Sequence, residues 1–186
     1  MDMMKFQALA LRTESPPNDE TIKRLVRTYP MYSEQLEEIV HLGGFLDHLK
    51  KYIFYRRQDG TVEDQLPPVW PTGEKRERIE QMARILHGLI GIITEAGELA
   101  EEVVNYIEGK KSELDTDHIS EEVFDGCLWY GNLILSAINK TIPQVAEQGI
   151  AKLQVRFPHK FTEEAAEHRD TTAEMTRFQE AGKTAP

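Results

Sequence analysis

The stretch from Glu74 to Ile107 carries the longest regular pattern in the chain and most constrains its fold. Large apolar residues recur through it at the spacing of a helix face. They are Ile79, Met82, Leu86, Leu89, Ile90, Ile93 and Val103. Gly109 follows, and glycine is the usual residue just beyond a helix C-terminus. The pattern therefore predicts one long amphipathic helix over 74–107.

Three glycines interrupt this helix pattern, at Gly88, Gly91 and Gly97. Glycine is a poor helix former, so its presence inside a helix calls for another reason. The usual reason is that a neighbouring helix approaches so closely that a side chain would not fit. We therefore expect a second helix to cross the long helix at this part of its length.

The remaining segments also have helical spacing, and we find no strand alternation and no internal repeat. The predicted helices cover residues 3–12, 18–28, 33–54, 120–139, 141–155, a short segment from Thr162 and a last one from Thr171 to Gly182. Tyr29-Pro30 is expected to end one helix and Gly43-Gly44 to weaken another. Ser120 and Thr141 are expected N-caps. Residues 57–73 are rich in proline and predict a loop pinned by Trp70. The fold class predicted is all-α, a helical bundle.

Composition limits the classes of function that fit. A chain of 186 residues is long enough for a single domain with a substantial core. Its net charge of −10 argues against binding to nucleic acid, which needs a basic surface. A single cysteine, Cys127, excludes an intrachain disulfide and is expected to be a small buried residue. No leader peptide or membrane-length apolar run is visible, so we expect a cytoplasmic protein without membrane contact.

Two acidic pairs of the same shape are the main candidates for chemistry. Glu95 and Glu98 are three residues apart, and so are Glu122 and Asp125. Residues three apart lie on one face of a helix, so two packed antiparallel helices would direct four carboxylates at one volume. Such a cluster repels itself unless a cation neutralises it, and oxygen ligands suit Mg²⁺ or Mn²⁺. The pairs predict a metal site on a helix pair.

The stripe that starts at Glu122 continues through polar and aromatic residues. Trp129 and Asn132 follow Asp125 at steps of four and three. This order suits a metal at one end and a flat polar ring beside it, as in a nucleoside triphosphate. Lys152 and Arg156 are four residues apart on one helix face and could hold phosphate oxygens. Lys160 and Arg169 are further basic candidates.

Each of these patterns also has a simpler interpretation. Acidic pairs on helices commonly form a solvated face, and the neighbouring Glu101 and Glu102 show how frequent acids are in this chain. The basic residues could equally pair with surface acids. Glu38 and His41 form an ExxH unit of the kind found in di-iron bundles. Those bundles need two such units and only one is present, so His41 is expected at the surface.

Three segments together resemble a known family. They are LHGLIGIITEAGELAEEV, then SEEVFDGCLWYGNLI, then IAKLQVRFPHKFTEEAAEHRD. Their order is similar to that in the MazG-like nucleoside triphosphate pyrophosphohydrolases of the all-α NTP pyrophosphatase superfamily, whose signature is ExxE followed by ExxD. The resemblance covers about 87–170. It implies a single domain with its core over 74–170, a family-variable insertion over 30–73, and a C-terminal helix and tail over 171–186.

The resemblance also implies an activity, Mg²⁺-dependent hydrolysis of a (deoxy)nucleoside triphosphate to the monophosphate and pyrophosphate, in a homodimer or homotetramer. By carry-over, the metal ligands are Glu95, Glu98, Glu122 and Asp125. Lys152 and Arg156 match the family's phosphate contacts, and Trp129 matches an aromatic residue of the nucleotide pocket. A metal-activated water would attack the α-phosphorus, with Glu101 or Glu102 accepting its proton. The alternatives are a dUTPase-like enzyme, an alarmone hydrolase or a non-catalytic helical interaction protein.

Overall fold

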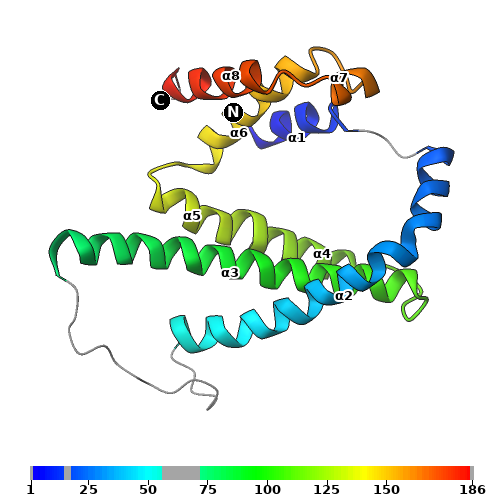
Figure 1. Ribbon diagram of the computed structural model, residues 1–186, viewed down its shortest axis with the longest axis horizontal. Coiled ribbons are helices and arrows are strands. Elements are labelled where there is room, and N and C mark those ends of the chain that lie inside the picture. The colour runs from blue at the N-terminus through cyan, green and yellow to red at the C-terminus, as the bar shows by residue number, and fades with distance from the viewer. Residues whose placement is uncertain (1, 15–17, 56–71, 185–186) are drawn as a thin grey trace. The chain divides into compact units, whose positions relative to one another are not determined.

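The computed structural model describes residues 2–14, 18–55 and 72–184, with the side chains of residues 29–32 and 184 excepted. Within these ranges every regular element is a helix, so the all-α prediction is confirmed (Figure 1). The chain divides into two compact units, one formed by Met1–Leu25 with Lys140–Pro186 and the other by Val26–Asn139. The single domain expected from the sequence stays a prediction.

The unit Val26–Asn139 is built on α3, Gly73–Ile107, which confirms the predicted long helix. Along it pack α4, Thr116–Val123, the π-helix η1, Phe124–Tyr130, and α5, Gly131–Ala137 (Figure 1). Gly109 follows the end of α3 with a φ of 72°, the left-handed conformation that glycine adopts without strain. The buried apolar residues of this unit lie on α3, η1 and α5. They are Ile90, Ala100, Val104, Tyr130 and Ala137.

The helix α2 runs without interruption over Asp19–Tyr55, so the helix end predicted at Tyr29-Pro30 was wrong. Pro30 removes only one backbone hydrogen bond, and the helix continues on both sides of it. The helix also continues through the Gly43-Gly44 pair, and Gly43 has a packing role there. A Cβ on Gly43 would lie 3.1 Å from the Cα of Gly97 in α3. The two helix backbones therefore meet at a glycine–glycine contact.

The three glycines inside α3 that the sequence singled out have the predicted role, because each one faces a close neighbour. A Cβ on Gly88 would lie 2.7 Å from the carbonyl oxygen of Tyr130, and a Cβ on Gly91 would lie 2.3 Å from the Tyr130 ring. Gly97 faces Gly43 of α2. The close approach of two neighbours, α2 and the η1–α5 segment, explains glycines that helix propensity alone would disfavour.

The region around α4 differs from the prediction in two ways. Asp115, and not Ser120, is the N-cap, with its side chain accepting a hydrogen bond from the backbone N–H of His118. The expected single helix over 120–139 is also divided by the π-helical segment Phe124–Tyr130. A π-helix has a wider turn than an α-helix, so the spacing rules of an α-helix do not hold through it. Cys127 lies in this segment and is exposed, so its predicted burial was wrong.

The second unit contains α1, Met3–Leu11, α6, Ile142–Arg156, α7, Glu163–Glu167, and α8, Thr171–Thr184. Helices α6 and α8 run side by side, and α1 also contacts α6 (Figure 1). Thr141 caps α6 through a capping box with Gln144, and Thr162 caps α7. These starts agree with the predicted ones. The buried apolar residues here are Ile150, Ala151 and Phe157.

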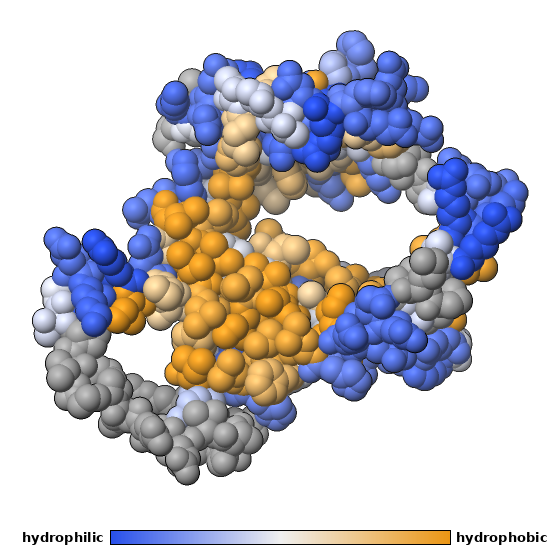
Figure 2. Space-filling model, in the orientation of Figure 1, coloured by the Kyte–Doolittle hydropathy of each residue, from blue (hydrophilic) through white to orange (hydrophobic). Residues whose placement is uncertain are grey.

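Apolar side chains are exposed along the unit Val26–Asn139, where Figure 2 shows hydrophobic surface gathered over α3 and α5. Four residues of α3 form one stripe at helical spacing, with exposed fractions between 41% and 63%. They are Ile79, Met82, Leu86 and Leu89. In the described part of the chain, no helix has the length and apolar character needed to cross a membrane. The predicted loop over 57–73 with Trp70 lies almost wholly outside the described residues.

Adjacent glycines in α2 provide a matched test of the helix contact. We expect Gly43→Gln to lower the free energy of unfolding by about 1–3 kcal/mol, because its side chain meets the α3 backbone. Gly44→Gln is the control, since a Cβ there meets nothing within 4 Å. It should raise stability by up to about 1 kcal/mol through helix propensity. Urea unfolding followed by circular dichroism measures both, and equal effects would contradict the contact.

Candidate metal centre

The predicted acidic residues come from three consecutive elements of the unit Val26–Asn139. Glu95 and Glu98 lie on α3, Glu122 lies near the end of α4, and Asp125 lies in the first turn of η1. The elements meet closely here, because a Cβ on Gly126 would lie only 3.3 Å from the Cβ of Glu95. The predicted convergence of acids from two packed helices is therefore present for Glu95, Glu98 and Glu122.

One group of side chains could hold a cation. Glu98, His118 and Glu122 each offer a ligand atom, and the three atoms lie within 4.8 Å of one another. His118 and Glu122 are four residues apart on α4, and Nδ1 of His118 lies 3.1 Å from Oε1 of Glu122. Glu98 reaches the group from α3. Two helices thus contribute two carboxylates and one imidazole to a small volume.

Glu122 is the buried member of this group, with an exposed fraction of only 6%. Its Oε2 atom is buried and has no hydrogen-bond partner among the described residues. Burial raises the pKa of Glu122 to about 8, helped by the neighbouring carboxyl groups of Glu95 and Glu98. Burial and the charge of Glu95 also raise the pKa of Glu98. A carboxylate in this position is stabilised by a cation, so the donor set fits a divalent metal ion.

Glu95 is neutralised by a residue of α2. The ammonium group of Lys50 lies 3.5 Å from Oε1 of Glu95 and 3.3 Å from Oδ1 of Asp47. Lys50 is only 5% exposed, so this charge depends on its acidic partners. The ion pairs with Lys51 and Lys50 lower the pKa of Asp47 against the opposing effect of burial. One lysine therefore already balances part of the acidic cluster.

Asp125 does not belong to the group within 4.8 Å that Glu98, His118 and Glu122 form in the described residues. It is half-buried in η1, after the change from α-helical to π-helical geometry. The stripe predicted from Glu122 through Asp125, Trp129 and Asn132 assumed α-helical spacing, which η1 interrupts. Trp129 is 43% exposed and its ring lies 4.5 Å from that of Tyr130. The ligand role of Asp125 stays a prediction.

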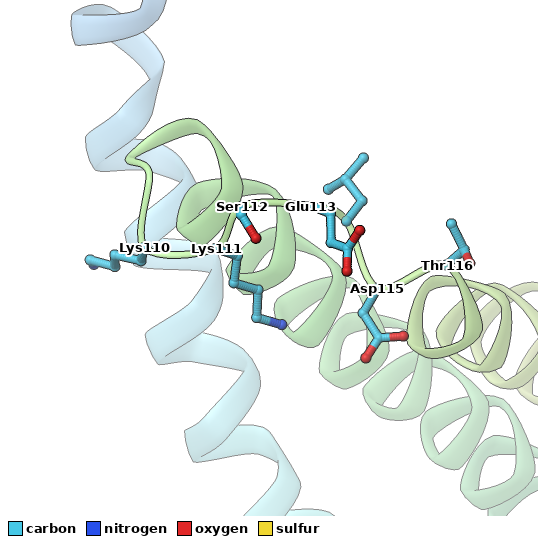
Figure 3. A pocket seen from close by; sticks show the side chains of 7 residues that line it. Lys110, Lys111, Ser112, Glu113, Asp115 and Thr116 are labelled. Carbon is cyan, nitrogen blue, oxygen red and sulfur yellow. The ribbon is translucent and has the colours of Figure 1, made fainter.

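Glu102, a predicted proton acceptor, holds the loop between α3 and α4. It is 2% exposed, accepts a 2.8 Å hydrogen bond from the backbone N–H of Asp115 and pairs with Lys111. These contacts lower the pKa of Glu102, which makes it a weak base. The loop forms an open hollow lined by 110–116, in which Lys111 and Asp115 extend from the same side (Figure 3). Glu101 is exposed, and its role as proton acceptor stays a prediction.

An aromatic cluster lies beside Lys50. Its ammonium group is 5.1 Å from the centre of the Tyr130 ring, a cation–π distance. His87 stacks on Phe54 with 4.0 Å between ring centres, and its Nε2 atom is buried without a partner among the described residues. Burial and the charge of Lys50 lower the pKa of His87, and burial raises that of Tyr130. The rings of this cluster surround one side of the buried Lys50 with neutral, polarisable groups.

The predicted basic residues lie in the other unit, and two of them share one acid. Arg156 donates from Nε and Nη2 to Glu174 at 2.8 and 2.6 Å, and Nη2 of Arg169 donates to the same carboxylate at 3.1 Å. Glu174 is 2% exposed. The simpler interpretation of the sequence expected these basic residues to pair with surface acids. Arg156 and Arg169 do pair with an acid, but that acid is buried. Lys152 is half-buried, and Lys160 is exposed beside Phe161.

Sequence reasoning missed three members of the centre, His118, Lys50 and Asp47. His118 lies four residues before Glu122, which is a recognisable helical spacing once α4 is known to begin at Thr116. Lys50 and Asp47 are distant in the sequence, and no local pattern connects them to Glu95. Glu38 and His41 of the ExxH unit do not belong to the group found among the described residues, and His41 is exposed on α2 as expected.

Comparison with protein-family models, with curated proteins and with solved structures found no match for the chain.

Glu174 gives a pH-dependent prediction. Its ion pairs with Arg156 and Arg169 lower its pKa from 4.5 to about 2. A lowered pKa in the folded state means that the pairs stabilise the fold fully above pH 4.5 and lose this effect as the pH falls towards 2. We expect Glu174→Gln to lower the free energy of unfolding by roughly 2 kcal/mol at pH 7.

The difference between the wild type and Glu174→Gln should shrink as the pH is lowered from 6 to 3. Urea unfolding at each pH measures it. Glu180→Gln on the same helix is the control, because its side chain is 57% exposed and its pair with Arg177 is at 3.7 Å. A constant difference at every pH would contradict the assignment.

Proposed function

We propose that the chain is a metal-dependent nucleoside triphosphate pyrophosphohydrolase. The observation that carries the proposal is the group of Glu98, His118 and Glu122, in which Glu122 is buried and its Oε2 has no donor among the described residues. Acidic residues from adjacent helices, with one carboxylate oxygen that lacks a donor, suit a Mg²⁺ or Mn²⁺ ion that binds phosphate oxygens. The resemblance of the ExxE and ExxD segments to the MazG-like family supplies the substrate class.

The reaction needs positioning and charge neutralisation more than covalent chemistry from the protein. A water oxygen forms a bond to the α-phosphorus, and the bond from that phosphorus to the α–β bridging oxygen breaks. Pyrophosphate leaves with the bridging oxygen, and the water loses one proton. When bound, the metal ion would supply Lewis acidity towards the phosphate and lower the pKa of the water. Glu101 would accept the proton, because Glu102 is engaged by Lys111 and Asp115.

Cationic side chains would offset the charge of the polyphosphate. Lys50 already lies within the acidic cluster, next to Glu95. Lys152 and Arg156 are proposed as phosphate contacts from the resemblance alone. Arg156 donates to Glu174, so phosphate binding by this residue requires the pair to loosen or to share the guanidinium group. Lys160, Arg169, Trp129 and Asn132 remain proposals of the same kind.

We further propose a homodimer or homotetramer. The exposed apolar stripe of α3 supports this proposal, because a stripe of four large side chains at helical spacing is typical of a helix that packs against another. A second copy of the chain would supply an identical helix. The stripe is also consistent with the alternative proposal, a non-catalytic protein that binds a helical partner. That alternative predicts no pyrophosphate release with any nucleotide.

Hydrolysis of a nucleotide panel tests the function. With Mg²⁺ we expect pyrophosphate and a monophosphate from at least one canonical, modified or deoxyuridine triphosphate, and chelation by EDTA should stop the reaction. Glu122→Gln should reduce turnover at least about a hundredfold, because it removes the buried anionic donor. Product separation by ion-exchange chromatography measures both. Products other than a monophosphate and pyrophosphate would redirect the proposal to another hydrolase of the superfamily.

Glu121→Gln is the matched control, because Glu121 is the exposed neighbour of Glu122 on the same helix. It should retain the wild-type rate. Glu122→Gln should also keep its helix content and unfold at no lower temperature, since it removes a buried ionisable group. Undiminished turnover in a folded Glu122→Gln protein would refute the site.

The proposed assembly has a separate test. We expect Met82→Glu to shift the protein towards a monomer, because Met82 is 63% exposed at the middle of the stripe and a charge there opposes burial. Light scattering coupled to size-exclusion chromatography measures the mass. Met175→Glu, at a residue 50% exposed on α8, is the control and should leave the mass unchanged. A monomeric wild type would contradict the assembly.

A further inference from the structure

The metal centre contains an imidazole that an all-oxygen site does not need. His118 is the third residue of α4, and its backbone N–H is fixed by the N-cap Asp115 at 3.0 Å. The cap determines where the helix begins, so it also determines which face His118 occupies. Its spacing of four residues from Glu122 then places the ring beside that carboxylate, with Nδ1 3.1 Å from Oε1.

The charges around this group favour a cation at His118 and Glu122 over one at Glu95. Lys50 already pairs with Glu95 at 3.5 Å, and Lys50 is itself buried. Glu122 is more than nine-tenths buried, and its Oε2 has no donor among the residues the structure describes. An unpaired buried oxygen is a costly arrangement that a bound cation relieves. The group within 4.8 Å accordingly includes Glu98, His118 and Glu122.

We propose that His118 is a metal ligand, which makes the centre a mixed nitrogen–oxygen site selective for Mn²⁺ over Mg²⁺. Mg²⁺ is a hard ion that prefers oxygen and keeps its waters, whereas imidazole nitrogen is a good ligand for the transition metals. One imidazole beside two carboxylates therefore shifts the preference of the site. The metal preference depends on these side chains alone. The inference therefore rests on the proposed function only for the nucleotide substrate.

A second interpretation of the same geometry is an ion pair, in which a protonated His118 serves as the cation for Glu122. In that case the imidazole neutralises the acid, contributes no lone pair and competes with a metal ion. The two interpretations predict opposite effects of removing the ring. Loss of a ligand weakens Mn²⁺ binding, whereas loss of a competing cation leaves it unchanged or strengthens it.

The test uses the full chain, freed of metal by dialysis against EDTA, and titrates it with Mn²⁺ or Mg²⁺ alone in a calorimeter. We expect the wild type to bind Mn²⁺ at least about tenfold more tightly than Mg²⁺. His118→Asn should weaken Mn²⁺ binding about tenfold or more and change Mg²⁺ binding much less. His41→Asn is the control, because His41 is exposed on α2. An unchanged ratio of the two affinities in His118→Asn overturns the proposal.

Electron spin echo spectroscopy of the wild-type Mn²⁺ complex provides a readout that needs no variant to fold. Modulation from a directly bound ¹⁴N nucleus is expected, and its absence overturns the proposal. The result is separable from the enzymatic activity. Nitrogen coordination without pyrophosphate release would leave His118 as a ligand and refute the hydrolase. Pyrophosphate release with a metal that shows no nitrogen ligand would refute His118 as a ligand and leave the hydrolase proposal standing.

Discussion

The close approach of helix backbones to α3 is the constraint on which the unit Val26–Asn139 depends. Gly97 meets Gly43 of α2, and Gly88 and Gly91 receive Tyr130 of η1. Larger residues at these positions would move both neighbours outward. The same contacts bring Lys50 of α2 and Glu122 of α4 towards Glu95 and Glu98. The position of the acidic centre thus depends on glycines, which have no reactive side chain.

The centre combines opposite charges at unequal degrees of burial. Lys50 and Glu95 are both buried and are joined as an ion pair, while Glu98 is exposed and Glu122 is buried without a donor for one oxygen. Breaking a buried pair leaves an uncompensated charge, so the lysine and Glu95 constrain one another. The carboxyl groups of Glu98 and Glu122 lie within the group that includes His118. Under the proposed function, this partition places the cation beside Glu98, His118 and Glu122 and not beside Glu95.

The sequence predicted the parts of the structure that depend on local chemistry. The extent of α3, the role of its glycines, the caps Thr141 and Thr162 and the pairing of acids on neighbouring helices all follow from spacing or from one side chain. It failed in α2, which continues through Pro30 and through Gly43, where Gly43 contacts α3. It also missed Lys50, whose partner Glu95 is 45 residues away. No periodic pattern connects residues so far apart, and only the packed helices reveal their contact.

The π-helical turn at Phe124–Tyr130 has a geometric consequence for everything that follows it. Each turn there takes in one more residue than an ordinary helical turn, so the chain arrives at α5 with its angular phase delayed. Glu122, before this segment, and Tyr130, at its end, are both buried. Shortening the segment by a single residue would rotate α5 about its own axis and exchange its inner and outer faces in part.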